Sequence, residues 1–160
     1  MPKEPSHFER IISGGQTGVD RAALDVALEL GIPCGGWCPK GRKAEDGLID
    51  PRYPLQETES TSYPVRTERN VKESDGTLIL TDGPVTGGTV ATVKFAQKHE
   101  KPYLMIDLGS GGDLETVRKW EETNKVRILN VAGPRESKIR GIHDKAVKFL
   151  RELLRSEDER

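Results

Sequence analysis

Three glycine-rich segments carry the residues best suited to binding a ligand. They run over residues 13–18, 82–89 and 132–137, and the first two stand directly before a predicted helix. Glycine lets backbone N–H groups approach an anion closely, and a helix N-terminus adds partial positive charge. These segments therefore predict a site for a small molecule that bears a phosphate. Its candidate residues are Ser13, Gly14, Gly15, Gln16, Thr17 and Gly18 in the first segment, Gly87, Gly88 and Thr89 in the second, and Arg135 in the third.

Alternating strands and helices must position these segments. Hydrophobic periodicity predicts strands over residues 8–13, 32–37, 77–81, 103–108 and 126–132, and helices over 19–30, 65–74, 87–99, 114–123 and about 139–154. Strands that alternate with helices of this length form right-handed crossovers around a mainly parallel sheet. We expect an α/β fold of five or six strands in one domain over residues 1–160, with its core at about 8–154. Ligands bind beyond the carboxyl ends of such strands, where the three glycine segments fall.

An irregular stretch over residues 38–63 interrupts this order. It contains only one suggested short strand, at 53–57, and it is longer than a plain connection, which is typical of a functional loop. Arg42 and Lys43 lie within it, and Arg135 lies in the third glycine segment. Arginine suits bidentate phosphate contacts, so Arg42 and Arg135 are candidate ligand contacts.

The standard nucleotide motifs are absent. A P-loop requires Gly-Lys-Ser/Thr, but Val19 follows Gly18. A dinucleotide fingerprint requires a glycine where Ser13 stands and an acidic residue after the second strand. Asp20 and Asp82 each stand beside a glycine segment. Either carboxylate can accept from the N–H groups of a base or pterin. The alternative is that each acid only stabilises the N-terminus of the following helix by its negative charge.

Composition excludes several classes of protein. The net charge is −1, so no global field attracts nucleic acid or an anionic membrane, and no apolar run is long enough to span a bilayer. The first ten residues lack the apolar region of a signal peptide, from which we expect a cytoplasmic protein with reduced thiols. Cys34 and Cys38 have no histidine nearby, which argues against a metal site. We expect Cys34 to be buried and Cys38 to be accessible.

Two further patterns concern packing. Leu24 and Leu28 give the helix over 19–30 a second apolar stripe. Either a homo-oligomer (a dimer or tetramer) or a covering loop would bury this stripe. The charged tail over residues 156–160 is predicted to fray.

Several of these segments together resemble the molybdenum cofactor carrier family. The matching segments cover residues 11–23, 41–47, 66–71, 74–77 and 87–89, in order and over almost the whole chain. The resemblance implies a Rossmann-like three-layer α/β/α fold, within the superfamily of the lonely-guy phosphoribohydrolases, which are often labelled lysine decarboxylases. It also implies a homo-oligomer that binds molybdenum cofactor as cargo, without catalytic residues, a resident catalytic cofactor or a protein-bound metal. Its partners would be molybdoenzymes or cofactor-synthesis proteins. Carried over, the resemblance adds Lys43 and Asn70 to the candidate contacts and supports Arg42.

The related hydrolases supply the alternative function. Their motif P-G-G-x-G-T-x-x-E uses its glutamate to cleave an N-glycosidic bond, whereas the two possible alignments place Lys94 or Thr92 there. The sequence therefore favours a binding protein over a nucleotide-processing enzyme, although Asp82 could supply an acid from another segment. A nucleotide or ADP-ribose sensor module is a third possibility.

Overall fold

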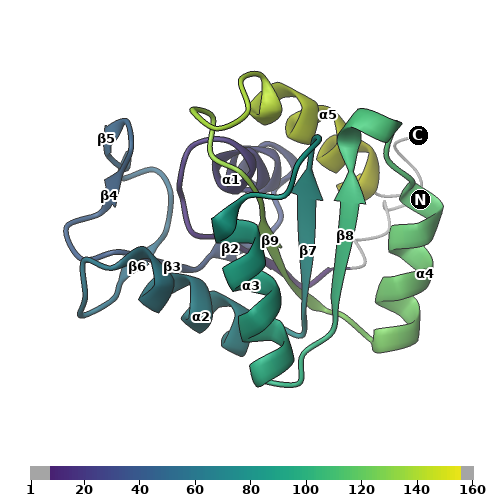
Figure 1. Ribbon diagram of the computed structural model, residues 1–160, viewed down its shortest axis with the longest axis horizontal. Coiled ribbons are helices and arrows are strands. Elements are labelled where there is room, and N and C mark those ends of the chain that lie inside the picture. Colours follow the sequence, from purple (N-terminus) through teal and green to yellow (C-terminus); the bar gives the residue numbers. More distant parts are fainter. Residues whose placement is uncertain (1–7, 156–160) are drawn as a thin grey trace.

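A five-stranded, all-parallel sheet forms the centre of the protein (Figure 1). The structure, a computed structural model, describes residues 8–155. The strands stand in the order β2-β1-β9-β7-β8, so β9, the last strand of the chain, lies in the middle. The sheet strands are β1 (Arg10–Ile12), β2 (Cys34–Gly35), β7 (Gly76–Thr81), β8 (Tyr103–Asp107) and β9 (Ile128–Ala132).

Helices cover both faces of this sheet. α1 packs with α5 on one face, where α4 joins the same apolar core, and α2 packs with α3 on the other (Figure 1). This arrangement confirms the predicted α/β three-layer fold. The helices are α1 (Val19–Leu30), α2 (Tyr63–Glu73), α3 (Gly87–Lys98), α4 (Leu114–Asn124) and α5 (Ile142–Leu154), and a short 3-10 helix, η1 (Leu108–Ser110), follows β8.

The two faces of the sheet differ in polarity because side chains alternate along a strand. Leu78 and Leu80 of β7 are fully buried in the apolar core beneath α1, α4 and α5. Thr77 and Thr81 of β7 point to the other face, where the side chain of Asn130 on β9 donates to the Thr77 hydroxyl over 3.2 Å. The face beneath α2 and α3 therefore carries buried polar groups.

Residues 36–62 leave the sheet and form a peripheral loop with small sheets of its own (Figure 1). β3 (Trp37–Cys38) pairs in parallel with β6 (Gln56–Glu57), and β4 (Lys43–Ala44) forms an antiparallel hairpin with β5 (Gly47–Leu48). The single strand predicted over residues 32–37 is wrong, because Gly36 has a φ of 128° and redirects the chain after Gly35. α2 also begins two residues before the predicted start.

The peripheral loop covers α1 with a second small apolar core. Leu24 and Cys38 are both fully buried there, beside Ile49, Tyr53 and Leu55. A covering loop therefore buries part of the second apolar stripe of α1. The predicted exposure of Cys38 is wrong, because the turn at Gly36 directs it beneath the loop, whereas Cys34 is half-buried. Burial raises the pKa of both thiols.

Two further expectations concern the charged tail and membrane-spanning helices. The tail over residues 156–160 lies outside the described residues. None of the helices that the structure describes is long and apolar enough to cross a membrane.

Candidate functional site

A cleft of about 510 Å³ opens at the carboxyl ends of the central strands. Its volume falls within the range of about 300–1,000 Å³ that is usual for small-molecule sites. The turn after β1, the loop after β9 and the N-terminal end of α3 form its rim, and α2 forms one wall. The lining residues are Gly14, Gln16, Asp20, Tyr63, Arg66, Thr67, Asn70, Thr86, Gly87, Gly88, Thr89, Thr92, Asn130, Val131, Ala132, Gly133, Pro134, Arg135 and Lys138. Seven of the thirteen residues predicted from the sequence are among them.

The N-terminal end of α3 presents an open backbone to this cleft. Thr86 caps the helix, and its hydroxyl accepts from the backbone N–H of Thr89 over 3.4 Å. Gly87 and Gly88 occupy the first two helical positions, where N–H groups have no partner within the helix. A Cβ atom added to either glycine would meet no atom within 4 Å. The α3 turn thus combines free donors, the positive end of a helix dipole and space for a bound group.

The first glycine turn is packed much more tightly. The Ser13 hydroxyl donates to the carbonyl of Val131 over 3.0 Å and is fully buried. A Cβ atom on Gly15 would lie 2.5 Å from Leu55, and one on Gly18 would lie 2.3 Å from the carbonyl oxygen of Pro134. From this segment only Gly14 and Gln16 line the cleft. Ser13, Gly15 and Gly18 therefore fasten the turn to β9, the peripheral loop and the segment after β9.

Glu45 ties the peripheral loop to the rim of the cleft. Its backbone N–H donates to the side-chain oxygen of Gln16 over 2.8 Å, and its carboxylate accepts from the hydroxyls of Thr17 and Ser137. Burial alone would raise its pKa, but these hydroxyl donors and the nearby charge of Arg135 hold the pKa of Glu45 below its ordinary value. Thr17 thus joins the rim of the site to the loop rather than lining the cleft.

A buried ion pair stands at the inner end of the cleft. Asp20 and Arg66 are 8% and 7% exposed, and their closest charged atoms, Oδ2 and Nη1, lie 3.8 Å apart. Nη1 of Arg66 also donates to the carbonyl of Gly14 over 2.6 Å. Burial raises the pKa of Asp20 from 3.8 to about 6, and the attraction of Arg66 opposes this rise. Asp20 is the one carboxylate among the lining residues.

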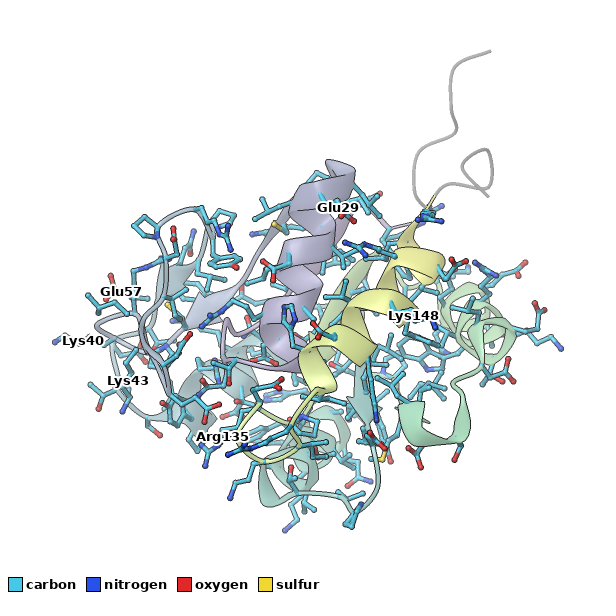
Figure 2. The ribbon with its side chains drawn as sticks, turned by 90° about the horizontal axis from the view of Figure 1, so that it is seen from above. Glu29, Lys40, Lys43, Glu57, Arg135 and Lys148 are labelled. Carbon is cyan, nitrogen blue, oxygen red and sulfur yellow. The ribbon has the colours of Figure 1, made fainter. Side chains whose placement is uncertain are left out.

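The loop after β9 supplies exposed positive charge. Arg135 and Lys138 line the cleft, and Arg135 lies on the loop between β9 and α5 (Figure 2). Nε of Arg135 lies 3.6 Å from a carboxylate oxygen of Glu45 and has no hydrogen-bond partner among the described residues. With Arg66, three cationic side chains and one carboxylate line the cleft, which favours an anionic ligand.

The other predicted contacts hold the peripheral loop. The guanidinium of Arg42 donates to the carbonyls of four loop residues, which are Ile49, Asp50, Tyr53 and Leu55. Nζ of Lys43 stands 4.9 Å from the centre of the Tyr63 ring and is outside the lining of the cleft, and Figure 2 shows Lys43 on the peripheral loop.

Asn70 lines the cleft and also bonds to the backbone of β3. Its side-chain amide accepts from the N–H of Trp37 over 2.8 Å and donates to the carbonyl of Trp37 over 3.0 Å. Both polar atoms are thus engaged in fixing β3 against α2.

Besides Arg66 on α2, four lining residues with polar or aromatic side chains were not selected from the sequence. Tyr63 and Thr67 stand on the first turns of α2, Asn130 on β9 and Lys138 after it. Asn130 carried a usable signal, since it interrupts an otherwise apolar strand. Tyr63 and Thr67 carried none, because only the packing of α2 beside the strand ends brings them to the site.

Comparison with known protein families matches residues 11–154 to the circularly permutated YpsA SLOG family, cpYpsA. The chain belongs to the cpYpsA family. This cpYpsA chain is also similar to the crystal structure of a protein from Syntrophus aciditrophicus SB, named a putative molybdenum carrier protein and solved at 1.45 Å resolution. The two share 44% sequence identity with a TM-score of 0.88, over 95% of this chain and 98% of that one. These matches confirm the resemblance drawn from the sequence. Comparison with curated proteins gave no match.

The strand order of the central sheet is easiest to recognise when the count begins at its last strand, β9. Numbered from β9 onward, β9, β1, β2, β7 and β8 become strands one to five, and the sheet reads 3-2-1-4-5. This is the order of the dinucleotide-binding Rossmann sheet, in which ligands bind where the order reverses. In this cpYpsA chain the reversal falls between β9 and β7, at the cleft.

Proposed function

We propose that this protein is a non-catalytic carrier of molybdenum cofactor, which binds in the cleft at the ends of β9 and β7. The observation that carries the proposal is the pairing of an open helix N-terminus with clustered cations in a cleft of about 510 Å³. The similar protein from Syntrophus aciditrophicus SB bears the name of a molybdenum carrier, which supports the same ligand.

The phosphate of molybdopterin fits the N-terminal end of α3. The N–H groups of Gly87 and Gly88 are free to donate there, and nothing lies within 4 Å of the positions that their Cβ atoms would take. Lys138 has no ion pair among the described residues, so its charge is available to the ligand. A phosphate dianion would gain charge-assisted hydrogen bonds from these groups.

The two positions that align with the glutamate of the related hydrolases carry no acid. Thr92 lines it and donates its hydroxyl to the carbonyl of Gly88 over 3.0 Å, while Lys94 is exposed and outside the lining. Asp82, the other acid considered from the sequence, lies outside the lining and pairs with Lys145 at 2.5 Å. These positions favour binding over nucleotide hydrolysis.

Cofactor content tests the proposal. The protein is produced in a host that makes molybdenum cofactor, purified without oxygen, and oxidised so that the bound pterin becomes fluorescent. Molybdenum is measured in the same sample. We expect pterin and molybdenum in the wild type and in Gly88→Ala, and neither in Gly88→Asp, whose carboxylate would repel the phosphate. Pterin bound equally by all three proteins would contradict the phosphate site.

The same proteins separate the alternatives. Release of free base from a panel of nucleoside monophosphates would establish the phosphoribohydrolase activity instead. Binding of nucleotides or ADP-ribose, with no pterin taken up from added cofactor, would establish the sensor module. A carrier must also deliver its cargo, so a molybdoenzyme or cofactor-synthesis protein is the partner we expect, and light scattering would give the number of copies in the homo-oligomer.

A further inference from the structure

The inner end of the cleft holds a carboxylate with spare hydrogen-bonding capacity. Oδ2 of Asp20 accepts from the backbone N–H of Gln16 over 3.4 Å and lies 3.8 Å from Arg66. Oδ1 accepts no hydrogen bond from the residues that the structure describes. Among the described residues, Oδ1 is not one of the fully buried polar atoms that lack a partner, so it keeps contact with the open space of the cleft. Such a group in a cleft points to a ligand that donates hydrogen bonds to it.

Arg66 places donors directly beside this acceptor. Its Nη1 donates to Gly14 and its Nε donates to the hydroxyl of Thr67 over 3.3 Å, while Nη2 makes no hydrogen bond within residues 8–155. The inner end therefore offers two carboxylate oxygens next to one free guanidinium donor. A complementary ligand edge carries two parallel N–H donors followed by a carbonyl oxygen.

We propose that Asp20 and Arg66 recognise the 2-amino-4-oxopyrimidine edge shared by pterins and guanine, with Asp20 accepting from the ring N–H and the 2-amino group and Arg66 donating to the 4-oxo group. The two N–H groups of that edge are parallel, like those of an arginine side chain, and a carboxylate accepts such a pair bidentately. This inference rests on the proposed function and names the part of the cargo that the protein selects.

Tyr63 provides a wall for the same ring. It lines the cleft on the first turn of α2, and the guanidinium carbon of Arg66 lies 5.3 Å from the centre of its ring. An aromatic face beside the Asp20–Arg66 pair suits the flat face of a bicyclic heterocycle. Stacking on Tyr63 does not distinguish one flat ring from another, so Asp20 and Arg66 would determine which ring binds.

Gly14 keeps the pair in place through close contact. A Cβ atom there would lie 2.3 Å from Nη1 of Arg66 and 2.9 Å from Oδ2 of Asp20. The first glycine of the turn therefore lets the backbone approach the recognising groups. A side chain at this position would displace them.

The test compares two ligands that differ at a single substituent. Neopterin monophosphate carries the 2-amino group, and the corresponding lumazine phosphate carries an oxo group there. Both are fluorescent and resist air, so their affinities can be measured by titration. We expect the wild type to bind the pterin at least tenfold more tightly, because a lumazine carbonyl would face the carboxylate without a proton to share.

Variants assign the selection to Asp20. Asp20→Asn presents one acceptor and one donor, so we expect it to lose the preference for the pterin while its affinity for the lumazine changes less than threefold. Asp82→Asn is the matched control, since it removes a carboxylate from the second glycine segment, outside the cleft lining, and should keep the full preference. GMP and IMP, which differ only by the same amino group, repeat the comparison on a second ring.

Each outcome decides between the two proposals. Equal binding of pterin and lumazine by the wild type would overturn the role of Asp20 and leave the phosphate-binding cleft standing. Binding of neither, together with no uptake of molybdenum cofactor, would overturn the carrier function itself. If Asp20→Asn does not fold, the wild-type pairs of ligands still decide the inference. An unchanged preference in folded Asp20→Asn would refute it.

Discussion

Two glycine turns stand at the same edge of the sheet and use glycine for opposite purposes. In the turn over residues 13–18, Gly14, Gly15 and Gly18 are glycine because neighbouring atoms occupy the space of a side chain. In the α3 turn, Gly87 and Gly88 face empty space. The first turn packs tightly against the peripheral loop and the segment after β9, whereas the α3 turn leaves open space beside its backbone. Glycines at equivalent places in the fold therefore have different surroundings.

The largest contrast is expected in stability. Gly18 combines a φ of 80° and a ψ of −131° with a Cβ position 2.3 Å from the backbone oxygen of Pro134. We expect Gly18→Ala to lower the free energy of unfolding by about 3 kcal/mol or more, from backbone strain and steric conflict. Gly88→Ala should stay within about 1 kcal/mol of the wild type, because alanine suits a helix better than glycine. Urea unfolding measures both; equal losses would remove the distinction.

The first turn also borders the buried carboxylate of Asp20. The pKa of Asp20 is about 6 in the folded protein, against 3.8 for an ordinary aspartate. The folded state therefore holds this proton more tightly, and the stability that it contributes is present below pH 4 and is lost as pH rises through 6. The full effect is about 3 kcal/mol, at about 1.4 kcal/mol for each pH unit.

The pH effect is isolated by comparison with a variant. The free energy of unfolding of the wild type minus that of Asp20→Asn should rise as pH falls from 7 to 4. Taking this difference removes the opposite trend that both proteins share from acids with lowered pKa values, such as Asp46 and Asp113. Arg66 on α2 and Arg21 on α1 are the charged groups that act on Asp20. A flat difference curve would show that Asp20 does not titrate in this range.

Arg42 belongs to the residues that hold the peripheral loop and not to those that line the cleft. Its four bonds to backbone carbonyls fasten the peripheral loop. Water can replace the arginine at carbonyls near the surface, so the total loss is closer to the value of one charged hydrogen bond, about 1.5–3 kcal/mol, than to the sum of four. We expect Arg42→Ala to cost about 2 kcal/mol in stability and to expose the peripheral loop to proteolysis. Limited proteolysis followed by mass spectrometry locates the cuts. Cleavage outside residues 36–62 would contradict this assignment.

The smallest expected effect separates two lysines near the cleft. Lys138 lines it without an ion pair among the described residues, whereas Lys43 stands against Tyr63 from the peripheral loop. Lys138→Ala should weaken binding of a pterin phosphate about fivefold, or about 1 kcal/mol, and more strongly at low salt. Lys43→Ala should change it less than twofold. The reverse order would move the phosphate toward the peripheral loop.

The sequence was most informative where a pattern depends on near neighbours. Helical periodicity located α1 and α3, and the apolar run at residues 77–81 located β7 within one residue of its start. It failed at residues 32–38, because the break at Gly36 is set by Ser13, whose carbonyl oxygen would lie 2.3 Å from a Cβ there. Two-residue strands such as β3 depend on partners distant in sequence.

The candidate site shows the same limit. The glycine segments were correctly placed at one edge of the sheet, because strand ends of a parallel sheet meet there. Their different surroundings could not be predicted, since Leu55 and Pro134 reach Gly15 and Gly18 only in the folded chain. The burial of Arg66 against Asp20 likewise depends on how α2 packs, so the sequence did not indicate this pairing.

The central place of β9 has a consequence for how the chain folds. β1 pairs on one side with β9, from Ile11 to Leu129, and β7 closes the other side of β9. During synthesis, β1 and β7 are made long before the strand that joins them, and contacts so distant in sequence slow folding. Until β9 has been made, no strand pairing joins β1 and β2 to β7 and β8. The cleft, which takes residues from both halves of the sheet, therefore cannot form before β9 has been made.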